Sequence, residues 1–264
     1  MATVAAAFPF IEVKIDTSAL LPIAERAPGV IAVVGKTPNG AAGGTAPPNI
    51  PQVIDTTDQV NELFAQVQAG TVNDTPLSRS LKLALQQDPK PSKIYGVRVS
   101  GNNYAAALAG LEAADDVTFV SLAEEASVGA PAGDDPATDL HALKEHVETM
   151  SAEGQKRIGV AMIDPTRAKS PSYVSDASAA VASLKSDSSR MVMIAARGAT
   201  GDAATAAMAA IAGYEPQIST VLKRVRGITI PLEQQYGPSE IKGLSEQEIV
   251  PLIDPALIPG TSLH

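Results

Sequence analysis

Short apolar runs alternate with helical patterns between residues 93 and 212, and this alternation constrains the fold more than any other feature of the sequence. The apolar runs are KIYGVRVS (93–100), VTFVSL (117–122), RIGVAMID (157–164) and MVMIAA (191–196). The spacing of apolar residues predicts helices over 104–114, 138–152, 172–184 and 203–212. Apolar strands separated by helices are typical of a parallel sheet covered on both sides. The chain is therefore predicted to be α/β, with a mostly parallel or mixed sheet and helices on both faces.

The chain before residue 93 is predicted to add one interior strand and two helices. The run VIAVV (30–34) is apolar throughout, as interior strands are. It leads into GKTPNGAAGGTAPPNIPQ, whose Gly, Pro and Asn content predicts a surface loop. Helices are then expected from about residue 57 and over residues 76–87.

An extended arm is predicted at the N-terminus, over residues 1–20. Within it, apolar and charged side chains alternate as in a half-buried strand, over Phe10, Ile11, Glu12, Val13, Lys14 and Ile15. Ala27-Pro28-Gly29 separates this strand from the next one. Fourteen extended residues reach roughly 45–50 Å. The strand can therefore pair with its own sheet or with the sheet of another molecule.

The α/β alternation ends near residue 213. Residues 214–236 are predicted to be irregular or short strand, and residues 238–250 a short helix carrying Ile241, Leu244 and Ile249. The last fifteen residues contain three prolines. We therefore expect a core over residues 21–237 and a C-terminal extension over residues 238–264.

Composition excludes several classes of function. The formal charge of −9 makes nucleic acid an unexpected direct partner, because an acidic surface repels phosphates. The absence of cysteine excludes disulfides, thiolate catalysis and cysteine-based metal sites. No run of eighteen apolar residues occurs, so no membrane span is expected.

Two glycine-containing turns are candidates for nucleotide sites. Gly35-Lys36-Thr37 ends like a P-loop, but five residues separate Gly35 from Gly29 where four are needed, and Pro38 removes an amide. Gly198-Ala199-Thr200-Gly201 resembles part of a dinucleotide-binding turn, but Ala196 stands at the first glycine position. Both are interpreted as turns, the second with Asp202 as a helix N-cap.

Other candidate catalytic or metal-binding residues are few. His141 and His146 are five residues apart, which rotates them about 140° from each other on a helix, so a solvated helix face is preferred to a zinc pair. Asp164, at the end of an apolar run, is the best single catalytic candidate, yet an Asp before a Pro is typical of a turn. We therefore predict no catalytic, cofactor-binding or metal-binding residues, no cofactor, and no enzyme activity.

The order of segments resembles the tail sheath proteins of contractile phages and the sheaths of contractile bacteriocins and injection systems. Three stretches carry the resemblance: PGVIAVVGKTPNG, YGVRVSGNNYAAALAGLEAADDVTFVSLA, and AAMAAIAGYEP followed by VLKRVRGITIPL. The resemblance rests on the order and texture of these segments and covers most of the chain.

The resemblance implies a structural subunit that self-assembles into a helical sheath around a tail tube and contracts to drive injection. It further implies stacked hexameric rings, with tail tube, baseplate and tail terminator proteins as partners. The location would be a virion or a secreted contractile particle, assembled in the host cytoplasm. Sheath proteins usually continue into a further C-terminal portion, so a sequence that ends at His264 is expected to be either a fragment or a reduced member of the family.

Lys223, Arg224 and Arg226 form the densest basic cluster of this acidic chain. The cluster fits either an electrostatic contact with a neighbouring subunit or a charged edge strand that discourages aggregation. Two alternatives to the sheath function stay open. One is a baseplate or adaptor subunit on the same core, and the other is an α/β enzyme with a site near Asp164 and Gly198.

Overall fold

The computed structural model describes residues 29–37, 44–68, 70–129, 136–185, 188, 190–214 and 224–253. The predicted arm, with Phe10, Ile11, Glu12, Val13, Lys14 and Ile15, lies outside the described residues. So do Lys223 and residues 254–264.

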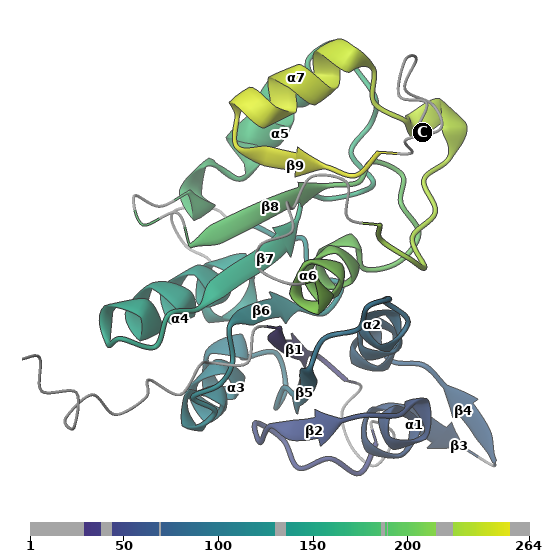
Figure 1. Ribbon diagram of the computed structural model, residues 1–264, viewed down its shortest axis with the longest axis vertical. Coiled ribbons are helices and arrows are strands. Elements are labelled where there is room, and N and C mark those ends of the chain that lie inside the picture. Colours follow the sequence, from purple (N-terminus) through teal and green to yellow (C-terminus); the bar gives the residue numbers. More distant parts are fainter. Residues whose placement is uncertain are drawn as a thin grey trace, which may run out of the picture.

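A seven-stranded sheet organises the described chain, in the order β2-β5-β1-β6-β7-β8-β9 (Figure 1). All neighbouring strands are parallel except β2, which runs antiparallel to β5. The strands are β1 (Val30–Gly35), β2 (Gln52–Ile54), β5 (Lys93–Arg98), β6 (Phe119–Leu122), β7 (Ile158–Met162), β8 (Met191–Ala195) and β9 (Ile249–Pro251). The predicted fold class is confirmed.

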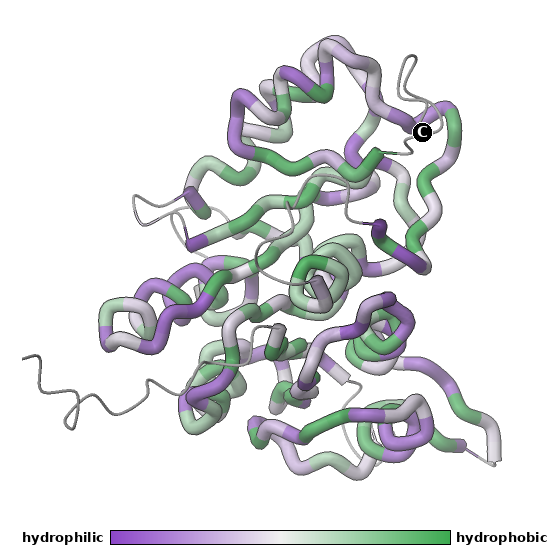
Figure 2. The backbone as a smooth tube through the Cα atoms, viewed as in Figure 1, coloured by the Kyte–Doolittle hydropathy of each residue, from purple (hydrophilic) through white to green (hydrophobic). Residues whose placement is uncertain are grey.

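Helices cover both faces of this sheet. Buried side chains of α3, α4, α5 and α7 form one apolar cluster with the sheet, and those of α1, α2 and α6 form another on the opposite face. The helices are α1 (Thr57–Phe64), α2 (Pro76–Leu85), α3 (Tyr104–Gly110), α4 (Leu140–Ala152), α5 (Tyr173–Ala180), α6 (Ala203–Gly213) and α7 (Pro238–Glu246). Figure 2 shows apolar residues following the central strands and the inner sides of these helices.

Strand β1 shows why the interior runs are apolar without alternation. Its side chains alternate between the two clusters: Ile31 and Val33 contribute to one, and Ala32 and Val34 to the other. All four are fully buried. A strand that is covered on both faces needs apolar residues at every position, which confirms the prediction of an interior strand.

Several elements are shorter than predicted or were not predicted. The helices starting at Tyr104 and Tyr173 end early and continue as 3₁₀ turns, Leu111–Ala113 and Ala182–Leu184. Strand β2 and a separate hairpin, β3 (Gln66–Gln68) with β4 (Thr71–Asn73), arise where a loop or no strand was expected. Strands of three residues are too short to show a period of two.

The segment after residue 238, which was expected to lie beyond the core, contributes α7 and the edge strand β9. Strand β9 pairs with β8, and Leu252 N–H donates to Ala195 O at 2.8 Å. Because successive backbone N–H groups of a strand point to opposite sides, position 251 faces away from β8. Pro251 has no N–H and so removes an outward donor from this edge of the sheet.

None of the helices in the described part of the chain combines the length and the apolar character that crossing a membrane requires.

Candidate functional site

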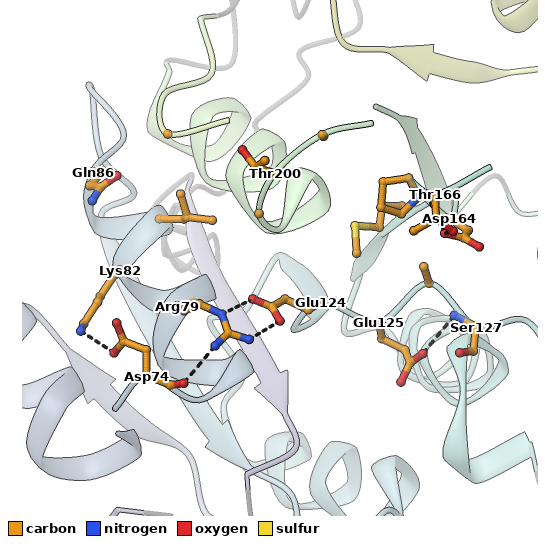
Figure 3. Close-up of a pocket in the computed structure, with 17 residues that line it drawn as sticks. Asp74, Arg79, Lys82, Gln86, Glu124, Glu125, Ser127, Asp164, Thr166 and Thr200 are labelled. Atoms are coloured by element: carbon orange, nitrogen blue, oxygen red, sulfur yellow. Dashed lines mark hydrogen bonds and ion pairs between the residues drawn. The ribbon is translucent and has the colours of Figure 1, made fainter. Parts of the chain in front are cut away.

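The carboxyl ends of the parallel strands form the edge where open α/β sheets bind ligands. Strand β5 lies on one side of β1, and β6 lies on the other side. The chain therefore leaves β1 in one direction and continues from β6 in the opposite direction, so the strand order reverses between β1 and β6. A cleft of about 820 Å³ opens at this edge. Its walls come from α2 and from the segments that follow β6, β7 and β8 (Figure 3). This cleft is the candidate site.

Ion pairs make up one wall of the cleft. Arg79 donates to both carboxylate oxygens of Glu124, from Nε at 2.7 Å and from Nη2 at 2.6 Å, and these bonds raise the pKa of Arg79. Lys82 pairs with Asp74, whose backbone oxygen also accepts from Arg79. In Figure 3 the Arg79–Glu124 pair faces Asp164 and Thr166 across the cleft. These charges therefore satisfy one another within the chain.

Lys36, from the P-loop-like turn, is held beside the reversal point by a small polar cluster. Its Nζ lies 3.0 Å from Glu125 Oε2 and 4.4 Å from the centre of the Tyr104 ring. Tyr104 Oη donates to the same carboxylate oxygen at 2.9 Å. Burial alone would raise the pKa of Glu125, but hydrogen bonds from Lys36, Ser127 and Tyr104 hold it below its usual value. The lysine thus binds a carboxylate of its own chain.

Asp202 is fully buried at the start of α6, and its carboxylate accepts several hydrogen bonds. Its Oδ1 accepts from Thr205 N–H at 2.9 Å, which confirms the predicted N-cap. Its Oδ2 accepts from Ser80 Oγ at 2.6 Å, Thr205 Oγ1 at 2.7 Å and Glu124 N–H at 3.0 Å. In a dinucleotide site this helix terminus would receive a phosphate. Here the carboxylate of Asp202 lies at the helix terminus as its N-cap.

Asp164 forms a turn at the end of β7. Its Oδ1 accepts from the backbone N–H of Thr166 at 2.9 Å and from Thr166 Oγ1 at 2.7 Å. This local pattern is the Asx turn that the following proline favours. Asp164 and Thr166 line the cleft with Thr200, so three oxygen-bearing side chains from two loops lie at one site.

The two histidines of α4 have separate partners. His141 Nδ1 lies 2.9 Å from Asp139 Oδ1, and its Nε2 lies 3.0 Å from Ser183 Oγ. His146 is buried and its Nε2 lies 2.8 Å from the Arg157 guanidinium. Burial and the nearby Arg157 lower the pKa of His146 to about 4. The interpretation as a solvated helix face was therefore wrong for His146, because Arg157, directly before β7, lies against it.

Metal-ligating side chains do not gather in groups of three or more anywhere in the described ranges.

A buried arginine that the sequence analysis did not single out lies at the end of β8. Arg197 is fully buried against the rings of Tyr173 and Tyr236, and its Cζ lies 4.5 and 4.7 Å from their centres. Its Nη1 donates to Glu240 Oε1 at 2.7 Å, and other nitrogens donate to the backbone oxygens of Gln234 and Gln235. Arg197 therefore fastens α7 to the sheet. The partners lie 37–43 residues away in sequence, so no local pattern could identify them.

The basic cluster is only partly available to a partner. Arg226 pairs with Asp88 of its own chain at 2.8 Å, and its backbone N–H and C=O bond to Gln87. Arg224 is exposed. Residues 224–230 form no strand; one isolated bridge joins Thr229 to Thr200. The alternative of a charged edge strand is therefore wrong for the described part of this segment.

Comparison with models of known families and with curated proteins gives no match for this chain.

Proposed function

We propose that the chain is a structural subunit of a contractile tail sheath, which self-assembles into a helical tube around a tail tube and contracts to drive injection. The tube, baseplate and terminator proteins would be its partners, and a virion or secreted contractile particle its location. The subunit would be no enzyme.

The arrangement of the three resembling stretches supports this proposal. PGVIAVVGKTPNG contains β1, and the second stretch contains most of β5 and all of α3 and β6. These three strands are neighbours, in the order β5-β1-β6. The third stretch begins in α6, which packs against this part of the sheet. The parts of these stretches that form β1, β5, β6 and α6 thus lie together in the core, while residues 224–232 of the last stretch run along the surface.

The bonding of the polar residues at the carboxyl edge is a second support. Lys36, Asp202 and Arg79 are the groups whose types would suit phosphate binding or proton transfer. Each is bonded within the chain, to Glu125, Thr205 and Glu124 respectively. A scaffold uses polar groups in this way, to fix loops and helix ends.

The observation that carries the proposal is the open edge at β2. This three-residue strand pairs with β5 on one side, and no described strand pairs with its other side. Val53 on β2 and Ile50 just before it are 43% and 51% exposed. An exposed edge accepts an added strand through backbone hydrogen bonds. An arm such as residues 10–15 of another copy has the alternating pattern to fill it, and head-to-tail addition builds filaments.

Electron microscopy of the purified protein tests the function, and tubes are expected. Removal of residues 1–15 should abolish tubes and leave a folded core, as measured by circular dichroism. A sharper pair replaces Ile11, Val13 and Ile15 with serine, or, as the control, Glu12, Lys14 and Asp16. Only the first triple variant should stop assembly, because only those side chains would pack on the sheet. Normal tubes from the truncated protein would refute the arm, and single rings would indicate a baseplate or adaptor subunit.

The cleft favours a second candidate, a ligand-binding α/β protein. It lies at the edge where such proteins bind small molecules, and Asp164, Thr166 and Thr200 line it. A monodisperse protein that binds a metabolite, with binding lost in Thr200→Val, would replace the sheath proposal.

A further inference from the structure

Exposed large apolar side chains occur at two places in the described part of the chain. One group comes from residues 50–72 and the other from residues 232–253. They are Ile50, Val53, Val67 and Val72 in the first group and Leu232, Val250 and Ile253 in the second. The sheet order places β2 at one border and β9 at the other. Figure 1 shows β2 and the β3–β4 hairpin at the opposite end of the molecule from β9 and α7.

The β3–β4 hairpin is the most prominent part of the first group. Its two strands pair only with each other, and five of its six strand residues are exposed. Val67 and Val72 are directly opposite in the pairing, so they share one face of the hairpin, and they are 57% and 45% exposed. A two-stranded hairpin without further packing is marginally stable in water. Contact on this face would stabilise it.

The base of the hairpin is held firmly. Thr75 Oγ1 donates to Phe64 O at 2.7 Å, which joins the start of α2 to the end of α1. Thr75 also caps α2 through Ser78 N–H at 3.1 Å. Phe64 is fully buried. The two ends of the hairpin are thus fixed by α1 and α2, which are bonded to each other.

Charge indicates that another copy of the chain is the partner. The chain has a net charge of −9, so two copies repel each other over most approaches. Residues 63–73, which contain the hairpin, carry no charged side chain at all. Most exposed strands are protected from association by charges or proline. This hairpin lacks both, so no charge on the hairpin itself opposes the approach of another copy.

We propose that the Val67–Val72 face of the hairpin packs on the β9 border of a second copy, at the exposed side chain of Val250, head to tail. This inference rests on the proposed function: in the sheath, the contact would join the cores of two subunits in addition to the arm. The hairpin and the β9 border lie at opposite ends of the molecule, so the contact is heterologous. Each copy can offer its hairpin to one neighbour and its β9 border to another. Apolar side chains of both surfaces leave water, and Pro251 prevents a full ladder of backbone bonds at the β9 border.

Charge reversal across the contact provides the test. Val67→Glu should weaken self-association of the full chain at least about tenfold, because a carboxylate would be buried opposite apolar residues. Val250→Lys should do the same from the other side. An equimolar mixture of the two variants should regain association, because the carboxylate introduced at position 67 of one copy then meets the ammonium group introduced at position 250 of the next. Gln68→Glu adds the same charge to the opposite face of the hairpin and should change association little.

Sedimentation equilibrium gives the dissociation constants, and circular dichroism checks that each variant is folded. Loss with Val67→Glu alone, no loss with Val250→Lys and no rescue by mixing would indicate a hairpin-to-hairpin dimer and overturn the proposal. Wild-type tubes that Val67→Glu leaves unchanged would overturn the contact while the sheath function stands. Reversible association that obeys the charge reversal but yields no tubes would establish the contact and refute the sheath function.

Discussion

At the scale of single residues, buried polar side chains fix the loops at the ends of the strands. Asp202 joins α6, α2 and the segment after β6 through one carboxylate. Arg197 joins β8, the start of α5 and α7. Arg157 donates to the Leu111 and Ala114 oxygens, which close the 3₁₀ turn after α3. Each of these residues stabilises connections that the apolar core alone would leave undetermined.

His146 predicts a specific pH dependence of stability. Its pKa is about 4 in the folded chain, against 6.5 for an ordinary histidine, because burial and Arg157 disfavour its charged form. Between these values the unfolded chain binds the proton and the folded chain does not. The stability that neutral His146 provides is therefore present above about pH 6.5 and is lost as the pH falls toward 4. The loss is on the order of 3 kcal/mol.

Urea unfolding of the wild type and of His146→Gln over pH 4–7 measures this loss. Glutamine does not titrate, and its side-chain oxygen can accept from Arg157. The difference in unfolding free energy between the two proteins isolates His146 from the carboxylates that titrate in the same range. The unfolding free energy of the wild type minus that of His146→Gln should fall steadily as the pH drops below 6.5. A difference that stays constant contradicts the prediction.

Very little of this residue-scale bonding could be predicted from sequence. Asp202 was identified as an N-cap because the cap lies directly before its helix. Its bond to Ser80 spans 122 residues, and no local pattern reports such a pair. His146 was misjudged for the same reason, since its environment depends on Arg157, which lies beyond α4 and directly before β7. Buried polar partners become visible only when the fold brings distant segments together.

At the scale of elements, α7 and β9 depend on one side chain more than on their own sequence. Strand β9 has three residues, and α7 buries only Leu244. Arg197 holds the start of α7 through Glu240, and burial would raise the pKa of Glu240 if Arg197 did not lower it. Few buried apolar side chains therefore support these two elements.

Arg197→Met should loosen α7 and β9 selectively. The substitution leaves Glu240 without its cation and removes the contacts with both tyrosine rings, at a cost of roughly 3 kcal/mol. Hydrogen exchange of amides in residues 238–252 should accelerate far more than exchange in β1.

Arg79→Met is the matched control. Like Arg197, which binds both carboxylate oxygens of Glu240, Arg79 binds both carboxylate oxygens of Glu124, but its side chain is 47% exposed. Its loss should cost less than about 1 kcal/mol. If Arg197→Met and Arg79→Met lowered the free energy of unfolding in urea by the same amount, burial would not be what makes the Arg197 ion pair stabilising.

Elements of the interior were predictable where the border elements were not. The runs at 30–34, 93–100, 117–122, 157–164 and 191–196 all contain strands, because burial on both faces demands uninterrupted apolar residues. Strands β2, β3, β4 and β9 have three residues each. Their existence depends on a neighbouring strand or a turn, so the sequence around them has no distinguishing pattern.

At the scale of the whole molecule, net charge governs how copies meet. With a net charge of −9, association has to overcome repulsion between copies. Salt screens that repulsion, with a Debye length of about 8 Å at physiological ionic strength. Association should therefore strengthen as sodium chloride rises from low to moderate concentration.

Light scattering at several salt concentrations measures this effect. Salt should strengthen association of the wild type, because its contacts are apolar or backbone-mediated. It should weaken association of the mixed Val67→Glu and Val250→Lys variants, whose contact relies on opposite charges. The same salt response in both samples would contradict the assignment of the contact surfaces.

The unlike borders of the sheet have one more consequence. The β2 side presents backbone donors and acceptors, while Pro251 interrupts them on the β9 side. A row of such molecules would therefore have a front and a back, as an arrow does. A strand that added to the β9 border would lack a backbone hydrogen bond at Pro251. The proline would therefore favour addition at the β2 border, which sets the orientation of each new copy during growth.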